Sequence, residues 1–164
     1  MADRSDRLLV VGLGSPIMSD DAVGLVVAEK VKEMGMPDVD VAMEAIGGLD
    51  IIPVLWGYRD VVIVDAIQTR QYEPGTVMIF DPEDFEPTIV SASAHDINLA
   101  TAMKIGRDTE PEMMPDRVKF VAIEAEDLQT MHEGMTPLVE AAVDRALDAV
   151  LYYLEDFRNQ PAKR

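Results

Sequence analysis

Three short, strongly apolar runs constrain this chain more than any other feature. They are LLVVG at 8–12, VVIVDA at 61–66 and VKFVAI at 118–123. Runs of this kind are typical of strands that are buried on both faces of a parallel sheet. Segments with helical spacing of apolar residues lie between them, so strands and helices alternate along the chain. The sequence therefore predicts an α/β fold, a three-layer αβα sandwich of about five mostly parallel strands with helices on both faces.

The remaining elements follow from periodicity and from turn residues. Segments 39–44 and 77–80 predict two further strands, and GGLDIIPVLWGY predicts a turn and a short helix. Longer helices are expected from Asp20 or Asp21 to the GMP at 35–37, from Ser93 as N-cap to near Gly106, and from Thr136-Pro137 onward. We expect one domain over residues 1–164, with 1–6 and 158–164 frayed.

Composition excludes several classes of function. The formal net charge of −17 argues against nucleic acid as a partner, because affinity for phosphate backbones comes largely from basic residues. No apolar run approaches the roughly 18–20 residues that span a bilayer, and the opening MADRSDR is polar, so we expect no membrane segment and a cytoplasmic protein. The absence of cysteine removes disulfides, thiolate metal ligands and a cysteine nucleophile.

The first apolar run leads into a glycine turn, LLVVGLGSPIMSDDAVG. A dinucleotide-binding turn needs a third glycine where this chain has Ile17, and no P-loop motif is present. Asp20 and Asp21 would also repel a pyrophosphate at the helix start. These residues disfavour a nucleotide-binding oxidoreductase. Two acids at a helix start have a simpler explanation, since they cap the helix and complement its dipole.

Three residues are candidate metal ligands. They follow strands or begin a helix, and the predicted fold would bring them to the same edge of the sheet. Asp21 follows the first apolar run, Asp65 ends the second, and His95 lies in the first turn of the predicted helix at Ser93. Ligands in open α/β sheets bind beyond the carboxyl ends of the strands. Two carboxylates and one imidazole make a three-ligand metal site with positions left for water or substrate. Taken singly, each residue also fits a structural or surface role.

Four segments together resemble the hydrogenase maturation endopeptidases, which process the large subunit of nickel–iron hydrogenases. They are VVGLGSPIMSDDAVG, VVIVDAIQTRQYEPGTVMIF, SASAHDINLATAM and EAEDLQTMHEGMTPLVEAAVDRAL, and the similarity runs from about residue 7 to 157. The resemblance implies removal of a C-terminal extension from the large-subunit precursor after nickel insertion. It places the metal contacts of the family on Asp21, Asp65 and His95.

The resemblance also implies the roles of other residues. Nickel would be supplied by the substrate, and another divalent ion such as zinc would be able to occupy the site in isolation. A weaker match in the second loop, EAIGG, assigns substrate contacts to Glu44, Gly47 and Gly48. The chain departs from the family pattern at Ser15, Ala22 and Asp96. The implied partner is the hydrogenase large-subunit precursor, and a monomer is favoured.

The chemistry can also be argued from the residues alone. Without a cysteine or a G-x-S-x-G turn, a covalent nucleophile is unsupported. A hydrolase would polarise the scissile carbonyl with a metal or activate a metal-bound water, with Asp21 or Asp65 as catalytic base. Two alternatives stay open: a nickel-checking chaperone that binds the precursor without cleaving it, and an aminopeptidase- or amidase-like hydrolase with a permanent metal.

Overall fold

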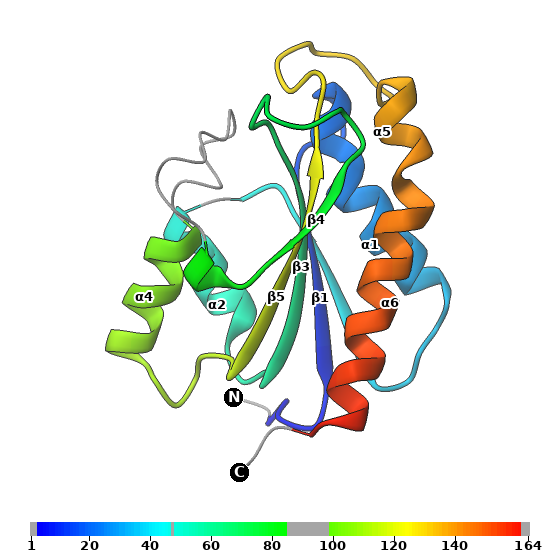
Figure 1. Cartoon of the computed structure of the whole chain (residues 1–164). Coiled ribbons are helices and arrows are strands. Elements are labelled where there is room, and N and C mark those ends of the chain that lie inside the picture. Colours follow the sequence, from blue (N-terminus) through cyan, green and yellow to red (C-terminus); the bar gives the residue numbers. More distant parts are fainter. Residues whose placement is uncertain (1–2, 47, 85–98, 162–164) are drawn as a thin grey trace.

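The computed structural model describes residues 3–46, 48–84 and 99–161, and it contains a five-stranded sheet. The strand order is β2-β1-β3-β5-β4, and all neighbours are parallel except β4, which runs antiparallel to β5 at one edge. The strands are β1 (Leu8–Leu13), β2 (Val39–Glu44), β3 (Asp60–Ile67), β4 (Val77–Phe80) and β5 (Arg117–Glu124). The predicted fold class, with a mostly parallel sheet, is confirmed (Figure 1).

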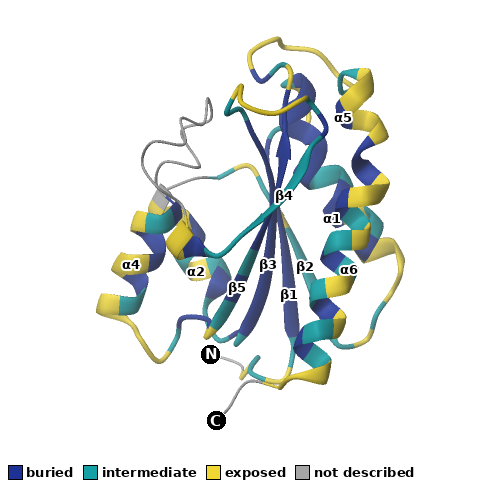
Figure 2. Cartoon of the chain, viewed as in Figure 1, coloured by how far each residue is buried: buried dark blue, intermediate teal, exposed yellow. Residues whose placement is uncertain are grey.

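Helices cover both faces of the sheet. On one side lie α1 (Val23–Glu33), α5 (Pro137–Ala141) and α6 (Val143–Asn159), and on the other lie α2 (Ile52–Leu55) and α4 (Leu99–Thr109) (Figure 1). Alternate strand residues enter two separate cores: Val62 and Val64 pack toward α1 and α6, whereas Val61 and Ile63 pack toward α2 and α4. This two-sided burial explains why the three central strands, β1, β3 and β5, are continuous apolar runs (Figure 2).

Some helix boundaries differ from the expected ones. The α4 helix continues three residues past Gly106, to Thr109, and the expected last helix is interrupted at Ala142 between α5 and α6. The α6 helix runs to Asn159, and Arg158 within it pairs with Asp38 at 2.7 Å, so this part of the tail is held to the body. Within the described residues, no helix is both long and apolar enough to cross a membrane.

Close backbone packing fixes α1 against the centre of the sheet. A Cβ atom at Gly24 would lie 2.4 Å from the carbonyl oxygen of Leu13 and 2.5 Å from that of Val64. A Cβ atom at Gly12 would in turn lie 2.4 Å from the carbonyl oxygen of Gly24. Both positions therefore need glycine, and together they set the place of the turn that precedes α1.

Replacing Gly24 with alanine is expected to lower the free energy of unfolding by at least about 2 kcal/mol, because two backbone carbonyls would have to move. Urea denaturation measures this loss. Gly35→Ala is the matched control: apart from its chain neighbours, no residue lies within 4 Å of its Cβ position, and its φ of +64° costs only about 1 kcal/mol. Equal losses in the two variants would contradict the close packing of α1.

The end of the sheet at which β1 and β2 begin is held by arginine–aspartate pairs. Arg7 donates to Asp40 at 2.6 and 2.9 Å, and Tyr58 donates to the same carboxylate at 2.8 Å. Arg158 lies beside Asp38 on the same edge. The hydrogen bond from Arg7 holds the pKa of Asp40 below its ordinary value of 3.8, and that from Arg158 lowers the pKa of Asp38 in the same way.

These pairs predict a loss of stability in acid. Because both pKa values are lower in the folded state, the pairs stabilise fully above pH 3.8 and lose their effect as the pH falls through the folded-state values. Both carboxylates are partly exposed, so solvent screens each pair and its contribution to stability is small. Urea unfolding between pH 7 and pH 2.5 should show a shallower decline for Asp38→Asn/Asp40→Asn than for the wild type. Asp144→Asn, on the exposed face of α6, should leave the wild-type decline unchanged, and the same decline in all three proteins would contradict the assignment.

Candidate functional site

Four buried carboxylates lie at the end of the molecule where β1, β3 and β5 finish. They belong to Asp20, Asp21, Asp65 and Glu124, and each residue is at most 7% exposed. In an open α/β sheet this edge is where ligands bind. The four residues come from three separate parts of the sequence, and the sheet order places β3 between β1 and β5.

Asp21 lies in the short 3-10 helix η1 (Ser19–Ala22), which connects β1 to α1. Gly14, at the end of β1, has a φ of +145°, and a Cβ atom there would lie 1.9 Å from the carbonyl oxygen of Asp21 and 3.8 Å from its Cγ. The second glycine of the G-x-G motif therefore lets the η1 turn fold back against the strand end. Gly14 thereby helps to fix the position of Asp21.

Asp65 lies within β3 and is fully buried. The strand continues to Ile67, one residue beyond the end expected from the sequence. One carboxylate oxygen of Asp65 accepts a hydrogen bond from the N–H of Ala66 at 2.8 Å. The η1 turn contacts β3, and Gly24 packs on the carbonyl of Val64, so the elements that carry Asp21 and Asp65 lie against each other as the sequence predicts.

His95, the third predicted ligand, lies outside the described residues, as do Asp96 and Gly47. In the part of the chain that the structure describes, no group of three or more histidine, aspartate or glutamate side chains is arranged to hold a metal ion. The three-ligand set therefore stays a prediction. The described part of the set, two buried carboxylates in a chain without thiols, has the oxygen donors that suit hard or borderline divalent ions.

Asp20 has a structural role that differs from helix capping. Its carboxylate accepts hydrogen bonds from the N–H groups of Glu126 and Asp127, both at 2.9 Å, and from the N–H of Thr136 at 2.7 Å. The hydroxyl of Thr136 donates to it as well, at 2.9 Å. The η1 helix has no side-chain cap. Asp20 therefore ties the turn that carries Asp21 to the loop after β5, and the simpler capping explanation does not apply to it.

Glu124 is a buried carboxylate that the sequence interpretation missed. It ends β5, is 1% exposed, and accepts hydrogen bonds from the N–H of Thr69, at 2.8 Å, and from the Thr69 hydroxyl. Thr69 follows β3, so Glu124 holds the loop that leaves the strand of Asp65. The signal was present, because an acid that ends a strongly apolar run is the same pattern that selected Asp65.

The loop that follows β2 begins beside the glycine turn that follows β1. Glu44 ends β2, and its carbonyl oxygen accepts a hydrogen bond from the N–H of Gly14 at 3.2 Å. Gly48 begins the 3-10 helix η2 (Gly48–Ile51). Glu44 therefore lies at the carboxyl edge that carries Asp21, whereas its role in substrate contact stays a prediction.

Comparison with known proteins decides the family. A family model described as hydrogenase maturation protease matches residues 25–153. The chain belongs to the hydrogenase maturation protease family. The hydrogenase 2 maturation protease of Escherichia coli is 29% identical over 153 residues, with 92% of each chain covered. A putative hydrogenase maturation protease of Methanocaldococcus jannaschii is 28% identical over 149 residues, covering 88% of this chain and 94% of the relative.

Solved structures agree with this membership. The hydrogenase maturating endopeptidase HybD from E. coli superposes with a TM-score of 0.78 at 28% identity, covering 92% of this chain and 93% of that one. The resemblance seen in the sequence motifs is thereby confirmed. A family of endopeptidases favours hydrolysis of a peptide bond over the nucleotide-binding alternative.

Proposed function

We propose that this hydrogenase maturation protease removes the C-terminal extension from the nickel-loaded large-subunit precursor of a nickel–iron hydrogenase. The observation that carries the proposal is the pair of buried carboxylates, Asp21 and Asp65, at the carboxyl edge of the sheet in a member of this family. The relatives named above are hydrogenase maturation proteases, which supports a hydrogenase subunit as the substrate.

Nickel in this proposal is part of the substrate. Asp21, Asp65 and His95 would contact the nickel that is already seated in the precursor, and would thereby distinguish loaded from empty precursor. Two carboxylates and one imidazole suit nickel or zinc, which are borderline ions, and three protein ligands leave positions for donors of the precursor. Zinc is therefore expected to be able to occupy the same residues in the isolated protein.

The chain supplies a base for the hydrolysis. Water adds to the carbonyl carbon of the scissile peptide, the C–N bond breaks, and the proton lost by the water passes to the departing amine. Asp21 or Asp65 would hold that proton, because a buried carboxylate is a competent general base. The sequence contains no cysteine, so a thiolate nucleophile is not used.

The test mixes the purified protein with its nickel-loaded cognate precursor under anaerobic conditions and weighs the product by mass spectrometry. Loss of a C-terminal peptide, and no loss from precursor without nickel, is the expected result. Nickel-dependent binding without shortening would instead identify a nickel-checking chaperone. A stoichiometric metal in the protein as purified, with cleavage independent of the nickel in the precursor, would identify a hydrolase with a permanent metal.

A further inference from the structure

Large apolar side chains are exposed on the loops that surround the buried carboxylates. Ile17 follows β1 and is 45% exposed, Tyr72 follows β3 and is 54% exposed, and Met131 follows β5 and is 75% exposed. Leu138, at the start of α5, is 53% exposed. We call these four residues the apolar rim. Exposed apolar side chains that gather on one face commonly mark a protein-interaction surface.

Hydrogen bonds and close packing join these loops into one surface. The N–H of His132, next to Met131, donates to the carbonyl oxygen of Ile17 at 2.9 Å. Gly75, three residues after Tyr72, packs so closely that a Cβ atom there would lie 2.5 Å from the carbonyl oxygen of Leu138. Backbone contacts therefore hold the loop of Ile17 beside that of Met131, and the loop of Tyr72 beside the start of α5.

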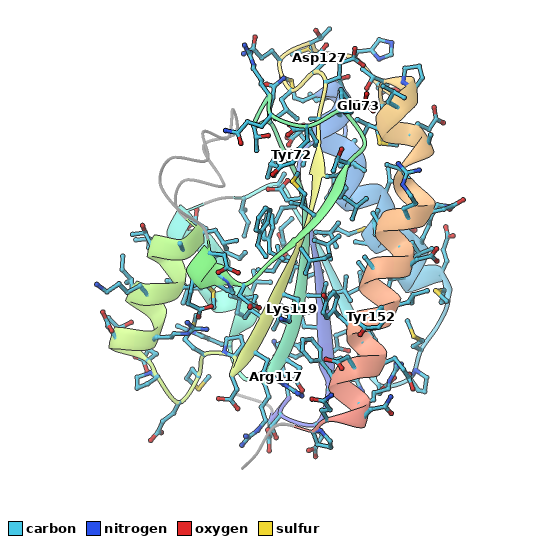
Figure 3. All side chains as sticks on the ribbon, in the orientation of Figure 1. Tyr72, Glu73, Arg117, Lys119, Asp127 and Tyr152 are labelled. Carbon is cyan, nitrogen blue, oxygen red and sulfur yellow. The ribbon has the colours of Figure 1, made fainter. Side chains whose placement is uncertain are left out.

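The same loops carry a strong negative charge. Segments 68–76 and 126–136 contain four acids, Glu73, Glu126, Asp127 and Glu133, against the single arginine Arg70. Figure 3 shows Tyr72, Glu73 and Asp127 at the end of the molecule where β5 finishes. The side-chain hydrogen bond with Thr130 lowers the pKa of Asp127, so this carboxylate stays ionised at neutral pH. A partner that covers the apolar rim therefore meets acids around it.

We propose that the apolar rim and its four acids form the docking surface for the precursor protein, through a precursor surface that combines apolar side chains with lysine or arginine. This inference rests on the proposed function, because the rim surrounds the site at which that reaction would occur. Apolar contacts supply affinity, and opposite charges steer the approach of the partner.

The negative charge of this surface argues against two other partners, a second copy of the chain and an anionic membrane. A second copy of the chain, docked by the same face, would bring the four acids against themselves. An anionic lipid surface would be repelled in the same way. A basic protein surface is the remaining occupant that the charges favour.

The test measures the dissociation constant for the nickel-loaded precursor at low and high salt. Ile17→Ala/Met131→Ala should weaken binding at least tenfold at both salt concentrations, as expected when large apolar side chains become buried against a partner. Glu126→Gln/Glu133→Gln should slow association and flatten its dependence on salt. Tyr152→Ala is the apolar control, because this residue is 65% exposed on α6, away from the rim (Figure 3). Asp144→Asn/Asp148→Asn, also on α6, is the charge control.

The possible outcomes separate the inference from the proposed function. If the wild type cleaves the precursor and both rim variants bind it as tightly as the controls do, the docking surface is wrong and the function stands. If the wild type neither binds nor cleaves nickel-loaded precursor, the proposed function is wrong. A rim variant that changes self-association in sedimentation, or flotation with anionic vesicles, while leaving precursor binding intact also overturns the inference.

Discussion

Asp21→Asn is expected to lower the rate of precursor processing by roughly a thousandfold or more, the scale on which a general base contributes. The substitution keeps the shape of a side chain that is only 7% exposed but removes its negative charge. The amide can neither hold a proton for the reaction nor attract a cation as the carboxylate does. Asp65→Asn and His95→Ala are expected to have effects of the same size.

Processing is measured by mass spectrometry on nickel-loaded precursor, and thermal unfolding shows whether each variant is folded. Asp148→Asn, on the exposed side of α6, is the matched control and should process at the wild-type rate. Normal processing by folded Asp21→Asn and His95→Ala would show that the assigned site is wrong. The proposed function would then need another set of residues.

Asp20→Ala is expected to lower the free energy of unfolding by about 3–5 kcal/mol. It would leave the N–H groups of Glu126, Asp127 and Thr136 without the acceptor that they share. Since domains are stable by only about 5–15 kcal/mol, this is a large part of the total. Urea denaturation measures it, and a loss below about 1 kcal/mol would contradict the structural role of Asp20.

Two further variants should lower the free energy of unfolding by smaller amounts than Asp20→Ala does. Thr136→Val removes the hydroxyl donor and leaves the three N–H groups bound, so its cost should be about 1 kcal/mol. Asp50→Ala changes an exposed acid of η2 and should stay within about 0.5 kcal/mol of the wild type. The expected order of loss is therefore Asp20→Ala, then Thr136→Val, then Asp50→Ala.

The centre of the sheet was predictable because β1, β3 and β5 are buried on both sides. Continuous apolar runs identified β1, β3 and β5, and alternation identified β2, each to within one or two residues. The break at Ala142 was not predictable, because the apolar spacing of the last helix continues through it. A periodic pattern reports the face that a helix buries and does not report a local change of its hydrogen bonding.

The two neighbouring acids of η1 show where sequence reasoning stops. Asp20 and Asp21 have the same chemistry and the same position at a helix start, so composition and spacing do not separate their roles. The donors to Asp20 are 106–116 residues away in the sequence, and only the folded chain brings them together. An acid at the end of an apolar run indicates Asp65, and Glu124 at the end of β5 has the same pattern.

The bonds from Asp20 to residues 126–136 have a consequence for synthesis of the protein. At roughly 5–20 residues per second, the ribosome delivers Thr136 on the order of ten seconds after Asp21. Until then the turn at Asp21 lacks the partners that hold it, and β3 lacks β5 beside it. A nascent chain thus cannot assemble this edge early, and the turn that carries Asp21 is held only after segment 126–136 has been made.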